Sequence, residues 1–256
     1  MKPVAIQLFS LRDEMQKDVK ATLKKVKELG YDGVEFAGLW GKTPEEMAEL
    51  VGELGLVPIS AHIPIGDLRK DASGVIECFK RVGCKHIVIP WLDEIDRPKS
   101  ESWENTKADF ERIGKIAAEN QMSLSYHNHG FEFEPLQNGV LGFDNIFETI
   151  SPDLLKMQQD VCWVHFSGHS PEKYLEKYKN RCPLLHLKDY SRENGEFGFR
   201  PVGHGEINFV SIIETAEKCG VEWYIVEQDK PTVGKTPFEC AEMSIKYLRE
   251  LRSPQK

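Results

Sequence analysis

The chain has 256 residues, of which 40% are hydrophobic and 29% are charged, and its formal net charge is −8. This composition is that of an ordinary globular protein and is sufficient for one large core. The negative charge argues against a nucleic-acid groove, which needs Lys and Arg gathered to neutralise phosphates, and it favours a small or neutral ligand.

The sequence also indicates where the protein works. It contains no run of 18 apolar residues, and its first segment, MKPVAIQLFSLRDEM, reaches Arg12 and Asp13 too early for a signal peptide. Six cysteines are spread along the chain without a CxxC or a short zinc-binding spacing. We expect these cysteines to be reduced and mostly buried, and the protein to be cytoplasmic, without a membrane partner.

Short β-rich runs recur along the chain, and each is followed by an amphipathic helical stretch. In chain order the runs span residues 4–9, 33–36, 57–62, 86–90, 122–129, 154–160, 183–189 and 222–228. The first helical stretch repeats Val19, Leu23, Val26 and Leu29 on one face and ends at Gly30, which can adopt the left-handed conformation of a helix cap. This alternation is typical of βα units that build a parallel sheet.

Eight such units match the size of a (β/α)8 barrel. No linker or low-complexity tract divides them, so the sequence predicts a single TIM-barrel domain over residues 1–256. An open doubly wound sheet is the competing fold, but no GxGxxG follows the first run and no GxxxxGK[ST] occurs. A nucleotide-binding protein is therefore disfavoured.

Polar residues stand where most of the β runs end, which in a TIM barrel is where the active site forms. They are Gln7, Ser10, Glu35, His62, His127, His129, Asp160, His186, Lys188 and Glu227. Taken singly, each could simply cap the following loop. Together, converging acids and imidazoles lose hydration and repel one another, and a bound divalent cation is the usual compensation. A ligand set of Asp, Glu and His suits Mn²⁺, Mg²⁺, Co²⁺ or Zn²⁺.

Several motifs also carry a family resemblance across essentially the whole chain. In order they are IQLFSLRDEM, YHNHGFEFE, DVCWV with the turn at 168–171, LHLKD, VGHGEIN and IVEQD. With these motifs the chain resembles the sugar phosphate isomerase/epimerase proteins of the xylose isomerase-like TIM barrel superfamily. The resemblance implies an enzyme, a sugar isomerase or epimerase that acts on a keto-sugar or a polyol derivative.

The resemblance also implies a metal site. Family members hold a divalent metal, often Mn²⁺, on an acid from strand five, an Asp from strand six, a His from strand seven and a Glu from strand eight. Asp160, His186 and Glu227 match the last three positions, but His127 stands where many members have Glu. Either His127 ligates the metal or Glu132 reaches back to it from the loop, and we favour His127.

The implied chemistry is removal of a proton next to a carbonyl to give a metal-stabilised enediolate. Glu227 is the preferred base, and His129, Glu132 or Lys188 could return a proton, although Lys188 could instead neutralise the oxyanion. Returning the proton gives isomerisation or epimerisation, whereas loss of a β-hydroxyl gives dehydration. Because inosose dehydratases resemble this family too, a lyase acting on an inosose or a 3-keto-sugar is the alternative.

Further residues are expected to bind the substrate, namely Gln7, Glu35, His62, Arg200 and His204. The loop at 203–206 either covers the substrate, with Arg200 just before it, or is an ordinary glycine turn. The sequence shows no dense Lys, Arg and Gly cradle for a phosphate beyond Arg192 and Arg200, so an unphosphorylated substrate is slightly favoured. The aromatic residues Trp91, Trp40 and Phe9 could form a wall for the C–H face of a sugar or could belong to the core.

Two other classes remain open from the sequence alone. A non-catalytic sugar-binding barrel would also fit the departure at His127, and a nuclease similar to endonuclease IV is disfavoured by the net charge. The resemblance further implies a homodimer or a homotetramer.

Overall fold

The computed structural model describes residues 1–193 and 195–252. Eight parallel strands close into a barrel in the order β1-β10-β7-β6-β5-β4-β3-β2. Their bounds are β1 Val4–Gln7, β2 Gly33–Phe36, β3 Val57–His62, β4 His86–Ile89, β5 Ser123–His127, β6 Lys156–Asp160, β7 Leu184–Leu187 and β10 Trp223–Val226. The predicted TIM-barrel fold is therefore confirmed.

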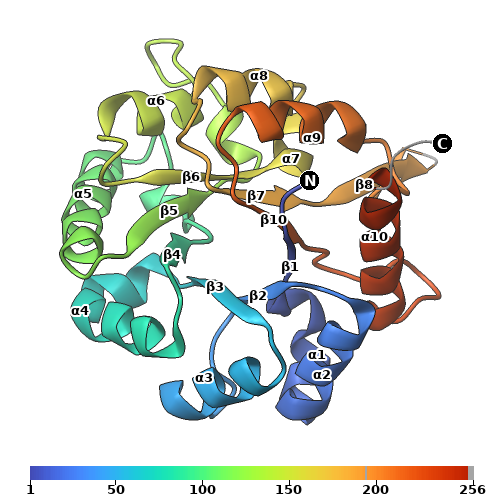
Figure 1. Ribbon diagram of the computed structural model, residues 1–256. Coiled ribbons are helices and arrows are strands. Elements are labelled where there is room, and N and C mark those ends of the chain that lie inside the picture. Colours follow the sequence, from blue (N-terminus) through green and yellow to red (C-terminus); the bar gives the residue numbers. More distant parts are fainter. Residues whose placement is uncertain (194, 253–256) are drawn as a thin grey trace.

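A ring of helices surrounds the barrel (Figure 1). The main helices are α1 Arg12–Lys17, α2 Val19–Leu29, α3 Pro44–Glu53, α4 Ile65–Val82, α5 Trp103–Glu119, α6 Gly142–Thr149, α7 Val161–Phe166, α8 Pro171–Lys177, α9 Phe209–Lys218 and α10 Pro237–Arg252. Short 3-10 turns lie at Leu8–Leu11, Glu94–Asp96 and Phe131–Phe133. The residues that pack these helices on the outer face of the strands form the larger core. No helix in the described ranges is both long enough and apolar enough to cross a membrane.

Several strands are shorter than their predicted runs, and this changes which residues stand in loops. The first strand ends at Gln7, so Phe9 belongs to a 3-10 turn. Likewise β5 ends at His127 and leaves His129 in the following loop. The inter-strand ladder ends at these points, because the chain must leave the barrel to reach the outer helices.

A hairpin between β7 and α9 was not predicted. Its antiparallel strands, β8 Asp189–Glu193 and β9 Glu196–Arg200, pair with each other outside the barrel. The sequence predicts one strand over 183–189, whereas the barrel strand is Leu184–Leu187 and Asp189 begins the hairpin.

The interior of the barrel is layered, with an apolar plug beneath polar side chains. The plug consists of Ala5, Ile59, Val88, Leu184 and Ile225. Above it, a bulge changes the register of β2 and β3, because Val34 pairs with Pro58 but Glu35 pairs with Ser60. The extra residue in β3 lets Ser60 reach Glu35 inside the barrel, where its hydroxyl donates a hydrogen bond of 2.6 Å.

Candidate metal centre at the barrel mouth

A cavity of about 390 Å³ opens at the carboxyl ends of the strands. Its lining consists of Phe9, Ala37, His62, Pro64, Pro90, Trp91, His127, His129, Lys188, Glu227 and Asp229. This is the end of the barrel at which TIM-barrel active sites form. Among the aromatic residues considered for a wall, Phe9 and Trp91 line the cavity, whereas Trp40 does not.

Four potential metal ligands converge at the floor of this cavity. One ligand atom from each of His127, Asp160, His186 and Glu227 lies within 4.8 Å of the other three. All four side chains are buried. The order of the strands explains the convergence. His127 and Asp160 are the last residues of β5 and β6, His186 lies in β7, and Glu227 directly follows β10. These four strands are consecutive neighbours in the barrel.

The donor set fits a divalent cation. Asp160 Oδ2 is buried and forms an ion pair with Lys188 Nζ at 3.1 Å. It lies 3.5 Å from His127 Nε2. Two carboxylates and two imidazoles at this spacing match the oxygen and nitrogen ligands of Zn²⁺, Mn²⁺ or Co²⁺. The chemistry of the residues therefore supports a metal site, without fixing the ion.

Lys188 lies in the same cluster and carries the compensating charge. Its Nζ is 2.8 Å from Glu227 Oε2, 3.1 Å from Asp160 Oδ2 and 3.1 Å from Asp229 Oδ1. Burial lowers the pKa of Lys188, but the three carboxylates outweigh burial and hold the pKa well above its usual value. The amine is therefore an ammonium at neutral pH. Asp229 was not among the predicted site residues, although the IVEQD motif contains it.

The two imidazoles of the cluster differ in charge. Burial and the neighbouring histidines hold the pKa of His127 well below its usual value, so its ring is neutral. Burial also lowers the pKa of His186, but Glu35 and Glu227 outweigh it and raise that pKa to about 10. In the metal-free protein His186 is therefore an imidazolium between two carboxylates.

Glu227 is ionised in this setting. Burial raises the pKa of Glu227, but Lys188 and His186 outweigh burial and hold it well below its usual value. A carboxylate that lines the cavity and stays ionised is available both as a ligand and as a proton acceptor.

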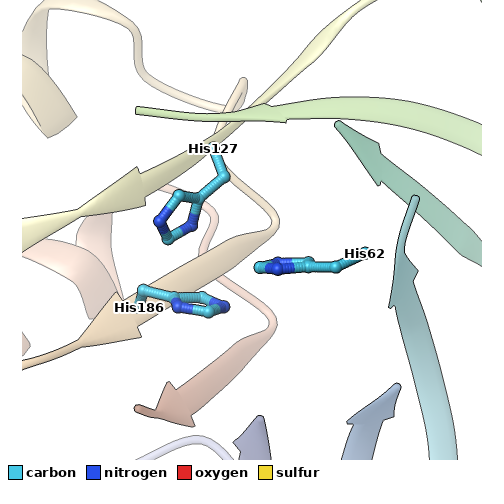
Figure 2. A group of neighbouring side chains, drawn as sticks. All are labelled: His62, His127 and His186. Atoms are coloured by element: carbon cyan, nitrogen blue, oxygen red, sulfur yellow. The ribbon is translucent and has the colours of Figure 1, made fainter. Parts of the chain in front are cut away.

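Three histidines from different strands point toward one another around this centre (Figure 2). The rings of His62 and His186 are nearly parallel, with centroids 5.3 Å apart. The ring centroids of His127 and His186 are 4.6 Å apart. His62, predicted to bind substrate, lines the cavity beside them. The three imidazoles could also hold a cation as a group.

Two of the predicted substrate-binding residues, Gln7 and Glu35, are completely buried and do not line the cavity. Glu35 lies beneath the histidines, where its Oε1 accepts hydrogen bonds from His186 Nε2 at 2.6 Å and Gln7 Nε2 at 2.9 Å. The structure places this pair beneath the cavity rather than in its lining. Both side chains point into the barrel one layer below its mouth, as members of a hydrogen-bonded network.

Glu132 is also completely buried, and it is not in the ligand cluster. Its carboxylate accepts hydrogen bonds from Tyr126 Oη at 2.5 Å and from the backbone N–H of His129 at 2.9 Å. Burial raises the pKa of Glu132 to about 7. Both oxygens are thus engaged in holding the loop after β5, away from the cavity lining. His129 itself lines the cavity, and its Nδ1 is buried without a hydrogen-bond partner among the described residues.

The loop at 203–206 does not cover the cavity, so the ordinary glycine turn describes it better. His204 is exposed and packs near Tyr247, and Arg200 pairs with Glu193 at 2.7 Å. Neither Arg200 nor His204 lines the cavity, so their contact with substrate stays a prediction. The backbone of the loop is tied down by hydrogen bonds to a buried side chain.

Asp189 is the residue that ties the loop down. Its carboxylate accepts backbone hydrogen bonds from Gly203, Gly205 and Ile207, at 3.0, 2.8 and 3.3 Å. The glycines permit this approach, since a Cβ at Gly205 would clash with Tyr190 O and Asp189 Oδ1. The sequence signal for this arrangement is the pair of glycines spaced two apart after LHLKD.

The closed barrel and the cluster at its mouth define a TIM-barrel protein with a candidate metal centre. The sequence profile of the family described as xylose isomerase-like TIM barrel matches residues 23–251, and the chain belongs to this family. The resemblance seen in the motifs is thereby confirmed.

The chain is similar to two inosose dehydratases. It is 25% identical to that of Geobacillus kaustophilus (strain HTA426), over 90% of this chain and 86% of the relative. It is 28% identical to that of Geobacillus thermodenitrificans (strain NG80-2), over 86% of this chain and 85% of the relative. These relatives are enzymes, in agreement with the prediction that this protein is one.

The fold is similar to that of a sugar phosphate isomerase/epimerase from Parabacteroides distasonis ATCC 8503, with a TM-score of 0.86. That structure is 24% identical in sequence, and the match covers 99% of this chain and 94% of the other. This similarity supports the TIM-barrel fold of the chain.

Proposed function

We propose that this protein is a metal-dependent enzyme that removes the proton next to the carbonyl of a keto-sugar or keto-polyol. The observation that carries the proposal is the convergence of His127, Asp160, His186 and Glu227 on one point beneath a cavity of about 390 Å³. These four residues would hold the divalent cation. Once bound there, the cation would supply a Lewis acid that stabilises negative charge developing on the substrate carbonyl oxygen.

Glu227 is the proposed base, because its ionised carboxylate lines the cavity. Lys188 is the proposed electrostatic partner, since its ammonium lies 2.8 Å from Glu227 Oε2 and also faces the cavity. His129 lines the same cavity, and burial holds its pKa well below the usual value. Its neutral imidazole is therefore the proposed group that accepts a proton and returns it.

The lining favours an unphosphorylated substrate. Among the described residues that line the cavity, Lys188 is the positively charged side chain, and three carboxylates already pair with its ammonium. Arg192 donates to Tyr190 Oη, and Arg200 pairs with Glu193. A phosphate would therefore find no uncommitted guanidinium in this lining. Exposed Phe9 and Trp91 at the cavity would contact the C–H face of a sugar ring.

The proposed proton removal leads to different products according to the fate of the enediolate. Return of the proton to carbon gives isomerisation or epimerisation, the outcome predicted from the motifs. Dehydration is the second candidate, favoured by the similarity to inosose dehydratases. In that case the ammonium of Lys188 would protonate the departing β-hydroxyl.

The experiment that tests the proposal is solvent isotope exchange. Purified protein, stripped of metal and reloaded with Mn²⁺, is incubated in D₂O with a panel of keto-sugars and inososes, and carbon-bound deuterium is measured by NMR. We expect exchange or product formation with at least one compound, and neither in the metal-free protein. Full activity without metal contradicts the mechanism, and no exchange across the panel favours a non-catalytic sugar-binding barrel.

Three finer expectations belong to the same proposal. Mn²⁺ is the expected ion, a homodimer or homotetramer is the expected assembly, and the cytoplasm is the expected location. Metal analysis, light scattering and cell fractionation would test them in turn.

A further inference from the structure

We propose that Glu35 and Gln158 are positioning residues, which fix the ring nitrogens that His186 and His127 present to the cation site. The inference rests on the metal centre of the proposed function. Glu35 and Gln158 are buried beneath the cavity and are not among the residues that line it. The network begins at a backbone group whose role as a donor is unambiguous.

The first link of the network is the backbone N–H of Phe9, which donates to Gln7 Oε1 at 2.9 Å. A backbone N–H can only donate, so this amide oxygen is the acceptor and the other end of the Gln7 amide is the donor. That end, Nε2, lies 2.9 Å from Glu35 Oε1. The orientation of the Gln7 side chain therefore makes Glu35 Oε1 an acceptor.

The same oxygen lies 2.6 Å from His186 Nε2. His186 must therefore carry hydrogen on Nε2, and when its ring is neutral the lone pair is on Nδ1. Nδ1 lies on the side of the ligand cluster, 3.2 Å from Glu227 Oε2. A carboxylate that accepts from one ring nitrogen while the other faces the ligands is the usual arrangement around metal-binding histidines.

A second branch leaves the other oxygen of Glu35. Gln158 Nε2 lies 2.7 Å from Glu35 Oε2, so the amide of Gln158 donates there and presents its oxygen to the opposite side. Gln158 Oε1 lies 3.0 Å from His127 Nδ1. His127 must then carry hydrogen on Nδ1 and a lone pair on Nε2, the nitrogen that lies 3.5 Å from Asp160 Oδ2.

Burial makes any other orientation of these amide groups energetically costly. Gln7, Glu35, Gln158 and His186 have no exposed surface, and His127 is 2% exposed. Reversing one amide would place two donors or two acceptors face to face in a dry interior, which costs roughly 1–3 kcal/mol for each buried group left unsatisfied. The network thus has one polarity. His127 presents a lone pair on Nε2 before a cation arrives, whereas His186 presents Nδ1, which becomes a ligand once the binding of a cation displaces its proton.

The tautomers can be read directly by ¹⁵N NMR of histidine in the intact protein. In the metal-free protein we expect His127 to show a protonated Nδ1 and an unprotonated Nε2. In the Zn²⁺-loaded protein we expect His186 to show a protonated Nε2. A His127 ring protonated on Nε2 instead would overturn the proposal, and because this measurement uses the unaltered chain, it does not depend on a variant folding.

The contribution to metal binding is tested with Gln158→Met, which removes the acceptor at similar volume. We expect the variant to bind Zn²⁺ about 10- to 100-fold more weakly by competition with a chromogenic chelator. The matched control is Ser125→Ala, because Ser125 is buried in the neighbouring strand β5 and its hydroxyl has no hydrogen-bond partner among the described residues. The control should bind Zn²⁺ like the unaltered protein.

Equal Zn²⁺ affinity in Gln158→Met and the unaltered protein would overturn the positioning role. Failure of the proposed function would give a different result from failure of the positioning role. In that case the protein binds Zn²⁺ and shows the expected tautomers, but produces no exchange from any keto-sugar or inosose.

Discussion

Glu227 is the residue on which the proposed chemistry depends most. Its carboxylate faces both the cavity and Lys188, and among the four potential ligands it alone also has a catalytic role predicted from the sequence. We predict that Glu227→Gln lowers the rate of solvent exchange by roughly 10²- to 10⁴-fold, because a positioned base contributes about that much. Exchange measured in D₂O under saturating Mn²⁺ checks this, and a rate within a few-fold of the unaltered enzyme would contradict it.

His127 and Glu132 are the two residues that the sequence leaves open for the strand-five ligand. The structure places His127 in the cluster and engages both oxygens of Glu132 elsewhere. We predict that His127→Ala loses most of its bound metal and that Glu132→Gln retains it, as measured by elemental analysis of protein reloaded and desalted in parallel. Loss of metal in Glu132→Gln alone would reverse the assignment.

Whether a residue at a strand end faces the cavity could not be predicted from the sequence. Gln7 and Glu35 have the same residue types and strand-end positions as true cavity residues, yet they lie one layer lower. That depth is set by the stagger of neighbouring strands and by the bulge in β3, which are properties of the closed barrel. The four ligand candidates were predicted correctly as a group that converges, because residues in consecutive strands at one end must meet.

At the scale of elements, the strands and helices of the barrel followed from local periodicity, but the hairpin of β8 and β9 did not. Asp189 ends a β-rich run, so the sequence predicts it to be part of a barrel strand. Its carboxylate is instead satisfied by backbone groups 14 to 18 residues further along the chain. Such long-range pairing leaves only a weak local signal, here the glycines at 203 and 205.

The stability of the segment formed by β8, β9 and the loop after them should therefore depend on Asp189. We predict that Asp189→Asn lowers the free energy of unfolding by about 1–3 kcal/mol, because an amide NH₂ would face backbone N–H donors in a buried site. Urea denaturation followed by circular dichroism measures the change. Ser191→Ala is the control, since the Ser191 hydroxyl lies in the same hairpin without a hydrogen-bond partner among the described residues. Equal stability of the two variants would contradict this role.

At the scale of the whole molecule, the buried carboxyl of Glu132 should make folding stability depend on pH. Its pKa rises from an ordinary 4.5 to about 7 in the folded protein. Between these values the native state holds a proton that the unfolded state has lost, so this group's contribution to stability decreases as pH rises through the window.

The comparison that isolates this contribution is the unaltered protein against Glu132→Gln, which cannot titrate. We predict that the free energy of unfolding of the unaltered protein, minus that of the variant, falls by about 3 kcal/mol between pH 4.5 and pH 7. Urea denaturation of both proteins across this range measures the difference. A difference that stays constant with pH would show that Glu132 keeps an ordinary pKa in the folded state.

The central claim is that a divalent cation binds among His127, Asp160, His186 and Glu227. Crystals grown with Mn²⁺ and measured at the manganese absorption edge test it most directly. An anomalous difference peak enclosed by these four side chains, and lost in crystals of Glu227→Gln with Asp160→Asn, is the predicted result. A protein saturated with Mn²⁺ that shows no peak at this position would contradict the account.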